Sequence, residues 1–350
     1  MMRQIAVIIA ISLAVASCSA GAHSTTRRVR PVHDELPVAL DNGSRGLSAA
    51  SPPGHVPPSL ACRDRVHATT RSLVARVLPD GPRARSGGLA FTSGVCVYLP
   101  PGYATRALRY PVVYLLHGGG GDQADAVTYG HIRTVMDGLV AQDRGRAAII
   151  VMPDGANGQW YDSVNGDLRN DEYVTKWVVG FIDRHFRTIA ARKGRAIVGV
   201  SNGGYGAMLF AAKHPDLFSA AGGMSSNLDA VTDATGAKFS GLRDANGSAF
   251  RANHPIELVA RLVNTDLVLD IADRCASNAP AALCPTQVVD AFFLEANREF
   301  VAAVRAQIGR KARLDYREDN AAHQWYWWSQ QLRDHQLPFL LARLANPAKG

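Results

Sequence analysis

Residues 199–203 read Gly-Val-Ser-Asn-Gly and place a serine, Ser201, between two glycines. A short apolar run, residues 196–198, precedes them, and small and apolar residues fill positions 204–212. This pattern predicts a strand, a sharp turn and a helix, the context in which G-x-S-x-G holds a nucleophile at the tip of the turn. Glycine is needed on both sides because a residue without a side chain lets strand and helix approach closely. The helix N-terminus would direct backbone N–H groups to the place where negative charge develops during attack.

A serine hydroxyl is a poor nucleophile and requires a base, which in turn requires an acid that orients it. With an elbow of this kind the chain order is Ser, then Asp or Glu, then His. His323 follows the last expected strand in a polar loop, and we predict that it is the base. Asp270, Asp273 and Asp290 all precede it at suitable places, and sequence position does not choose among them. Four other histidines stand in expected helices or at their ends and are interpreted as structural: His131, His185, His214 and His335.

The oxyanion that forms during attack needs fixed N–H donors. One is the amide of Asn202, directly after the serine, and the other is expected in the loop that follows the third strand. That loop reads His-Gly-Gly-Gly-Gly over residues 117–121, so we predict Gly119 as the second donor. Glycine runs also occur in phosphate-binding loops, but the chain has no G-x-x-x-x-G-K-[S/T] and no acidic residue at the Rossmann spacing.

Expected strands and helices alternate along residues 67–346, which we interpret as one catalytic domain. Strands are expected at 72–77, 95–99, 110–116, 147–152, 196–198, 218–224, 267–271 and 312–316, and helices at 132–142, 173–186, 204–212, 292–308 and 325–344. Such alternation predicts a mostly parallel sheet of about eight strands with helices on both faces. With the elbow after the fifth strand, this is the layout of an α/β hydrolase. Residues 225–263 are polar, rich in glycine and weakly periodic, and we interpret them as a lid or excursion.

The composition is that of a globular protein, because 47% of the 350 residues are hydrophobic and 19% are charged. The formal net charge of +8 comes partly from arginines such as those in residues 27–30, which could attract anionic lipid or wall polymers or remain a solvated tail. No basic stripe carries interleaved aromatic residues, so we expect no nucleic-acid partner. No Cys/His spacing is typical of a zinc site, and we expect neither a metal nor a cofactor.

The N-terminal segment predicts export. Residues 1–4 carry a positive charge, and residues 5–16 form an apolar run that is short for a membrane span. Val-Ala-Ser-Cys, ending at Cys18, resembles a bacterial lipobox and makes residues 1–18 a signal peptide with Cys18 as the lipidated mature N-terminus; ordinary cleavage a few residues later is the alternative. Residues 19–66, rich in Pro, Ser and Arg, are interpreted as a disordered tether. We therefore expect a bacterial envelope lipoprotein, tethered to the membrane, or a secreted protein.

The chain contains five cysteines, and four remain if Cys18 carries lipid. An even number in an exported protein favours disulfides. Four cysteines allow three pairings. Cys275 with Cys284 closes a short loop and is the local choice, and it would leave Cys62 to pair with Cys96.

Several short motifs occur one after another along residues 70–345. They are Tyr-Leu-Pro-Pro-Gly-Tyr at 98–103, Leu-Leu-His-Gly at 115–118, Val-Met-Pro-Asp-Gly at 151–155, Trp-Tyr at 160–161, Ile-Val-Gly-Val-Ser-Asn-Gly-Gly-Tyr-Gly-Ala at 197–207, Lys-His-Pro-Asp-Leu-Phe at 213–218 and His-Gln-Trp-Tyr-Trp-Trp at 323–328. Together they resemble the esterase family that contains esterase D (S-formylglutathione hydrolase), tributyrin and feruloyl esterases, and the secreted mycobacterial mycolyltransferases. The resemblance implies that Asp290, which begins Asp-Ala-Phe-Phe-Leu-Glu-Ala-Asn, is the acid rather than Asp270. Family elbows usually carry Met or another apolar residue where this chain has Asn202, which alters the polarity of the pocket but not the backbone donor.

The same motifs place a substrate pocket beside the expected triad of Ser201, Asp290 and His323. Its predicted residues are His117, Trp160, Tyr161, Tyr205 and Trp325, and packing in the core is the alternative for the aromatic ones. The function that follows is an exported serine esterase that hydrolyses a small-molecule, carbohydrate or lipid ester through an acyl-enzyme. An acyltransferase of the mycolyltransferase type, in which a sugar hydroxyl replaces water, is the first alternative. A non-catalytic envelope-binding lipoprotein is the second, and the intact Ser, Asp and His set argues against it.

Overall fold

The computed structural model describes residues 62, 73–77, 85–86, 89–90, 94–143, 145–155, 160–228, 242, 246–273 and 287–349. The chain divides into two units, Met1–Pro53 and Gly54–Gly350, and every described residue belongs to the second. The predicted signal peptide, Cys18, most of the predicted tether and the predicted Cys275–Cys284 pair lie outside the described residues. Within the described residues no helix has the length and apolar character needed to cross a membrane.

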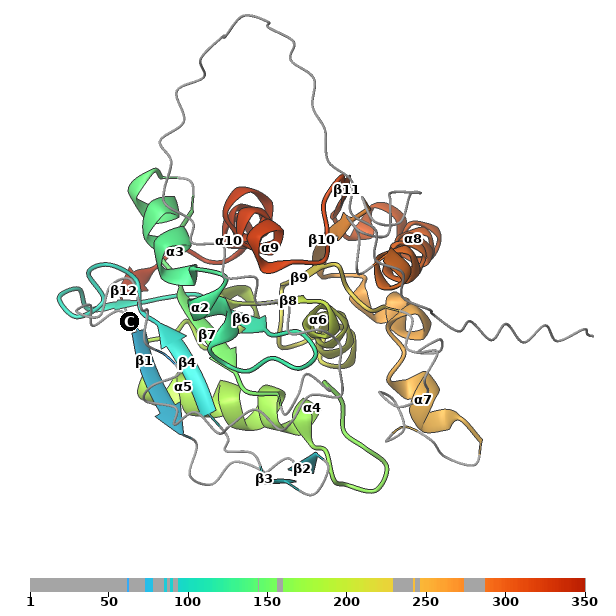
Figure 1. Cartoon of the computed structure of the whole chain (residues 1–350). Coiled ribbons are helices and arrows are strands. Elements are labelled where there is room, and N and C mark those ends of the chain that lie inside the picture. Colours follow the sequence, from blue (N-terminus) through green and yellow to red (C-terminus); the bar gives the residue numbers. More distant parts are fainter. Residues whose placement is uncertain are drawn as a thin grey trace, which may run out of the picture. The chain divides into compact units, whose positions relative to one another are not determined.

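Eight strands form one sheet in the order β1-β4-β7-β6-β8-β9-β10-β11 (Figure 1). Their bounds are Leu73–Val77 (β1), Gly94–Tyr98 (β4), Ile149–Pro153 (β7), Val112–Leu116 (β6), Arg195–Val200 (β8), Ala220–Met224 (β9), Asp266–Ala272 (β10) and Leu314–Asp319 (β11). Neighbouring strands run parallel from β7 to β11, whereas β4 runs antiparallel to both of its neighbours. The predicted mostly parallel sheet is therefore confirmed. Two short strand pairs stand apart from it: β2 (Arg85–Ser86) with β3 (Leu89–Ala90), and β5 (Leu108–Arg109) with β12 (Ala348–Lys349).

Helices cover both faces of the sheet, as the sequence predicts. Strand β6 shows why, because Val112, Tyr114 and Leu116 enter one hydrophobic cluster while Val113 and Leu115 enter another on the opposite face. The first cluster is completed by the π-helical turn η1 (Tyr173–Val178), which continues the short polar α4 (Asn170–Glu172), and by α5 (Val179–His185), α6 (Asn202–Lys213) and α8 (Gln287–Gln307). The second is completed by α2 (Asp125–Thr128), α3 (Ile132–Ala141), α9 (Trp325–Gln331), the π-helical turn η8 (Leu332–Gln336) and α10 (Leu337–Arg343).

Two predicted boundaries differ for physical reasons. The last strand is observed at Leu314–Asp319 rather than 312–316, and as the edge of the sheet it is only half-buried, which weakens its apolar signal. In the second half of the predicted lid, α7 (Ser248–Ala252) and the 3₁₀-helical segment η5 (Pro255–Leu262) are ordered helices. Val259 and Leu262 are fully buried in the cluster that contains α6, so these residues belong to the core. Residues 229–241, in the first half of the predicted lid, lie outside the described residues.

One disulfide joins Cys62 to Cys96 on β4, and both residues are buried. The predicted pairing of these two cysteines is confirmed. The bond fastens residue 62, which precedes the first strand by eleven positions, to a strand inside the sheet.

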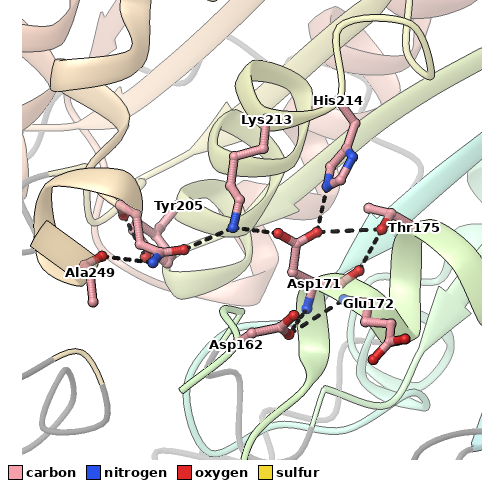
Figure 2. A network of polar contacts seen from close by, with 9 residues as sticks. Asp162, Asp171, Glu172, Thr175, Tyr205, Lys213, His214 and Ala249 are labelled. Atoms are coloured by element: carbon pink, nitrogen blue, oxygen red, sulfur yellow. Dashed lines mark hydrogen bonds and ion pairs between the residues drawn. The ribbon is translucent and has the colours of Figure 1, made fainter. Parts of the chain in front are cut away.

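Hydrogen bonds and ion pairs form a polar network at the C-terminal end of α6 (Figure 2). Asp171 at the start of the α4–α5 helical segment accepts hydrogen bonds from Lys213 Nζ at 2.5 Å and from His214 Nε2 at 2.6 Å. Lys213 also donates to Asn253 Oδ1 at 3.1 Å, which links α6 to the segment after α7. Burial alone would raise the pKa of Asp171, but His214 and Lys213 outweigh burial and hold that pKa below its ordinary value. His214, interpreted from the sequence as structural, takes part in this network.

Candidate active site

Ser201 stands at the turn between β8 and α6, in a backbone conformation that few residues other than glycine adopt. Its φ is +55° and its ψ is −120°. Four backbone hydrogen bonds hold this conformation: the N–H of Ser201 donates to Met224 O at 2.8 Å, and its carbonyl accepts from Gly204 N at 3.0 Å, Tyr205 N at 3.3 Å and Asn227 N at 3.3 Å. A strained residue held by its surroundings at the end of a parallel strand is typical of a functional site.

The glycines of the elbow are required by close contacts. A β-carbon on Gly199 would collide with the backbone of Gly203, and one on Gly203 would collide with the carbonyl oxygens of Leu116 and His117. A side chain at either position would therefore separate α6 from β8 or from the end of β6. This confirms the steric reason for the G-x-S-x-G spacing.

The glycine loop after β6 lies beside the elbow. A β-carbon on Gly118 would come 3.3 Å from Cβ of Ser201, and one on Gly119 would come 2.9 Å from Nδ2 of Asn202. The loop turns at Gly120, whose φ is +78°, and Gly121 N donates to Gly118 O at 3.2 Å. The two residues predicted as oxyanion donors, Gly119 and Asn202, are thus neighbours in space, and their donor roles stay a prediction.

His117 fixes the shape of this loop from inside the protein. Its Nε2 accepts the backbone N–H of Gly155 at 2.9 Å, so Nδ1 carries the proton and donates to Gly118 O at 2.8 Å. Its carbonyl accepts from Trp160 Nε1 at 3.0 Å. Burial lowers the pKa of His117 and favours the neutral form, although the bond to Gly118 acts in the opposite direction. His117 is 4% exposed and supports the loop from inside the protein, and its place in the substrate pocket stays a prediction.

Three of the other predicted pocket residues are core residues in this structure. Trp160 is 0% exposed, Tyr161 and Tyr205 are each 1% exposed, and the Tyr205 hydroxyl donates to Asn253 O at 2.8 Å. Their burial agrees with the alternative of core aromatic packing. Trp325 differs, because it is only partly buried and its ring lies 6.5 Å from that of Tyr129, which is 44% exposed.

His323 lies in the loop between β11 and α9, between two aromatic rings. The centroid of its imidazole is 5.2 Å from that of Phe293 in α8 and 4.8 Å from that of Trp328 in α9. Asp290 precedes Phe293 by three residues in the same helix, so the two positions share one face of α8. The Asp290 side chain lies outside the described part of the structure. The helix face that carries Asp290 nevertheless meets His323.

The two alternative acids have other environments. Asp270 is fully buried on β10 and accepts hydrogen bonds from His335 Nδ1 and Gln336 Nε2, each at 2.7 Å. Burial lowers the pKa of His335, but Asp270 and Asp315 outweigh it and raise that pKa above its ordinary value. A carboxylate engaged in this way serves the packing of η8 on the sheet, and His335 is structural, as interpreted. Asp273 donates its N–H to Asp319 O at 2.8 Å at the sheet end.

One residue beside the nucleophile, Asn227, was not predicted from the sequence. Asn227 follows β9 and contacts Ser201 through its backbone and Asn202 through its side chain. No motif surrounds it. The signal available was its position after a buried strand next to β8, because the carboxyl ends of parallel strands meet at one edge of the sheet.

Comparison with known proteins identifies relatives of the chain. The model of the family described as putative esterase matches residues 87–339. Esterase Rv1288 of Mycobacterium tuberculosis is 37% identical over 143 residues, which are 40% of this chain and 30% of that protein. The diacylglycerol acyltransferase/mycolyltransferase Ag85A of Mycobacterium ulcerans is 28% identical over 209 residues, 52% of this chain and 60% of that protein. The chain thus spans less than two thirds of the length of these curated relatives.

Solved structures show the same fold. A ferulic acid esterase superposes with a TM-score of 0.61 at 25% identity, covering 78% of this chain and 98% of the other. An S-formylglutathione hydrolase from Agrobacterium tumefaciens superposes with a TM-score of 0.58 at 22% identity, covering 79% and 98%. The sheet order, the strained serine and these superpositions confirm the α/β-hydrolase fold. Since the family model spans well over half of its length, the chain belongs to the putative esterase family.

Proposed function

We propose that the chain is a serine carboxylic ester hydrolase with Ser201 as its nucleophile. The observation that carries the proposal is the strained Ser201, with φ +55°, at the N-terminus of α6 and beside the Gly118–Gly119 loop. A helix N-terminus and a glycine loop can direct backbone N–H groups to one oxyanion. Family membership supports the same chemistry.

The mechanism uses His323 as base and Asp290 as the acid that orients it. As Ser201 Oγ bonds to the ester carbonyl carbon, its proton passes to His323, and the carbonyl electron pair moves to oxygen. The amides of Gly119 and Asn202 stabilise that oxyanion. Collapse of the intermediate expels the alcohol, which takes the proton from His323, and leaves an acyl-enzyme. A water then attacks the acyl carbon while its proton passes to His323. The bond between that carbon and Ser201 Oγ breaks, Oγ takes the proton from His323, and the carboxylic acid is released.

The test compares hydrolysis of p-nitrophenyl butyrate and covalent labelling by a fluorophosphonate in the parent protein and in Ser201→Ala. We expect the substitution to abolish both. Ser219→Ala is the matched control, because Ser219 directly precedes β9 and its hydroxyl donates to Arg195 O at the start of β8. Turnover by Ser201→Ala at the parent rate would disprove the mechanism. The same assay with esters of graded chain length would define the acyl preference.

Acyl transfer is the second candidate function, and the similarity to Ag85A favours it. A sugar hydroxyl would then replace water in the second half of the reaction, with the same residues acting. The test supplies an acyl ester together with trehalose or glycerol and measures the new ester by mass spectrometry. A transferase gives mainly the new ester, and a hydrolase gives mainly the free acid.

We also propose that the protein is exported, on the basis of residues 1–18, and that Cys18 carries a lipid anchor. Cys18→Ala should then move the protein from the membrane fraction to the soluble fraction. Unchanged fractionation would instead support ordinary signal cleavage and secretion.

A further inference from the structure

The turn after β9, residues 225–228, is fixed against the elbow by its neighbours. Ser225 has φ +44°, and its N–H donates to Asp270 O at the end of β10, at 2.8 Å. Asn297 of α8 donates through Nδ2 to Ser226 O at 2.7 Å. The turn is therefore held by the adjacent strand and by the helix that carries Asp290.

Asn227 holds the elbow through both its backbone and its side chain. Its N–H donates to Ser201 O at 3.3 Å, and its Nδ2 donates to Oδ1 of Asn202 at 3.4 Å. Asn227 is 3% exposed and Asn202 is 5% exposed. Because Oδ1 of Asn202 is directed to Asn227, the rest of that carboxamide has a defined orientation.

The other end of the Asn202 carboxamide faces the glycine loop. A β-carbon on Gly119 would lie 2.9 Å from Nδ2 and 3.6 Å from Cγ of Asn202, and it would meet no other described atom within 4 Å apart from its chain neighbours. On this side of Gly119, Asn202 is thus the one described side chain within contact distance. The carboxamide limits how far the loop can move towards α6.

We propose that Asn202 and Asn227 are positioning residues for the oxyanion hole. The side chain of Asn202 supports the backbone of Gly119, and Asn227 holds Asn202 in place. This inference rests on the proposed function, and it adds a side-chain role to a residue of which the mechanism needs only the backbone N–H.

The expected effect follows from the geometry that an oxyanion requires. Donors act when they lie about 2.7–3.1 Å from the developing negative charge, and removal of one donor costs roughly 10²–10³ in kcat. A displaced donor loses part of that factor, so we expect a fall of about tenfold. Substrate binding in the ground state does not use the oxyanion contact, so KM should change little.

The experiment measures kcat and KM for p-nitrophenyl butyrate in Asn227→Ala, Asn202→Ala and the double variant, each normalised to sites titrated by a fluorophosphonate. Normalisation separates misfolded protein from a slower active site. Because Asn227 acts through Asn202, the double variant should lose no more kcat than Asn202→Ala alone. A trifluoromethyl ketone, which forms an oxyanion on Ser201, should bind more weakly by the same factor by which kcat/KM falls.

Two further variants separate a role at Gly119 from a general loss of stability. Asn202→Met fills the space beside Gly119 without needing a hydrogen bond, so Asn227→Ala should have no effect on kcat in that background. Asn253→Ala is the matched control, because this buried amide serves the opposite end of α6 and should leave kcat per titrated site unchanged.

Parent kcat per site in Asn227→Ala would overturn the inference, and so would effects that multiply in the double variant. If Ser201→Ala is inactive while both asparagine variants are normal, only this inference fails. If Ser201→Ala retains activity, the proposed function itself fails.

Discussion

The two ends of helix α6 have opposite characters. At the N-terminal end Ser201 is strained, and the Oγ atoms of Ser225 and Ser226 and Oδ1 of Asn227 are buried without a hydrogen-bond partner among the described residues. At the C-terminal end, roughly 17 Å away along the helix, Asp171 is matched by Lys213 and His214 (Figure 2). Helix α6 therefore has a strained serine and buried polar atoms without a partner beside its N-terminal end, and paired charged side chains at its C-terminal end.

The difference indicates that the N-terminal end of α6 serves catalysis and that its C-terminal end serves stability. Backbone strain and buried polar groups without a partner reduce stability, and both are found most often at functional sites. The network at the other end fixes α6 to the α4–α5 segment and to the residues after α7, so the elbow rests on a stable helix. Substitutions at the N-terminal end should therefore change turnover, and substitutions at the C-terminal end should change stability.

The largest loss of turnover, after removal of the nucleophile, is expected from Asp290→Asn. Without the carboxylate, the imidazole of His323 adopts the wrong tautomer, and in serine proteases the equivalent change lowers kcat by about 10⁴. KM should change little. Steady-state kinetics on p-nitrophenyl butyrate provides the measurement, with sites titrated by a fluorophosphonate.

Asp270→Asn is the control for this prediction. It breaks a buried contact with His335 and should lower the free energy of unfolding by about 3 kcal/mol while kcat per site stays near the parent value. An active Asp290 variant together with an inactive Asp270 variant would show that the acid lies at the end of β10.

Gly203→Ala should lower turnover by about 10² or more, because a geometric error near 1 Å at the reacting group has that order of effect. The new β-carbon would collide with the carbonyl oxygens of Leu116 and His117, so α6 and Ser201 must move. Labelling by a fluorophosphonate should slow in parallel. The matched control is Gly138→Ala in α3, where a β-carbon meets nothing within 4 Å and stability should rise by about 0.5–1 kcal/mol. Equal behaviour of the two variants would contradict the steric account of the elbow.

Asp171→Asn tests the opposite end of the helix. Lys213 and His214 would lose their common partner, and since both keep contact with water we expect the free energy of unfolding to fall by about 2 kcal/mol, below the range for fully buried pairs. Urea unfolding provides the measurement, and kcat per titrated site should not change. Glu172→Gln is the control, because its partners Arg169 and Lys176 are exposed and the loss should stay below about 0.5 kcal/mol. A large loss of kcat in Asp171→Asn would show that the two ends are coupled.

The sequence predicted the elbow end of α6 far better than the network end. Gly199 and Gly203 have local steric causes, so a short motif reveals them, and the alternation of strands and helices reveals the sheet that presents Ser201. The network joins Asp171, Lys213 and Asn253 from three separate segments, and their pairing depends on how those segments pack. No spacing rule links residues so far apart in the chain.

The predicted pocket illustrates the same limit. Trp160 and Tyr205 belong to motifs that surround the nucleophile in sequence, yet both are buried in the core. A motif gives the order of residues along the chain but not the direction of a side chain. Asn227, which does contact the elbow, belongs to no motif because its proximity results from the parallel pairing of β8 with β9.

The smallest predicted effect is the pH dependence of the stability that the Asp171 network contributes. The sign of this dependence follows from the pKa of Asp171. His214 and Lys213 hold that pKa below its value in the unfolded chain, despite burial. The charged carboxylate therefore stabilises the fold above the unfolded pKa of about 4, and this contribution disappears as the pH falls through the lower folded value. The difference in unfolding free energy between the parent and Asp171→Asn should be constant near neutral pH and should shrink towards zero below about pH 4.

Urea unfolding of both proteins at a series of pH values measures this difference, while kcat/KM of the two proteins over the same range reports the ionisation of the active site. The two kcat/KM profiles should coincide, because Asp171 lies at the other end of α6 from Ser201. A stability difference that persists in acid would mean that the carboxylate charge does not carry the effect. Displaced kcat/KM profiles would mean that the network tunes the active site, and the two ends of the helix would then act as one unit.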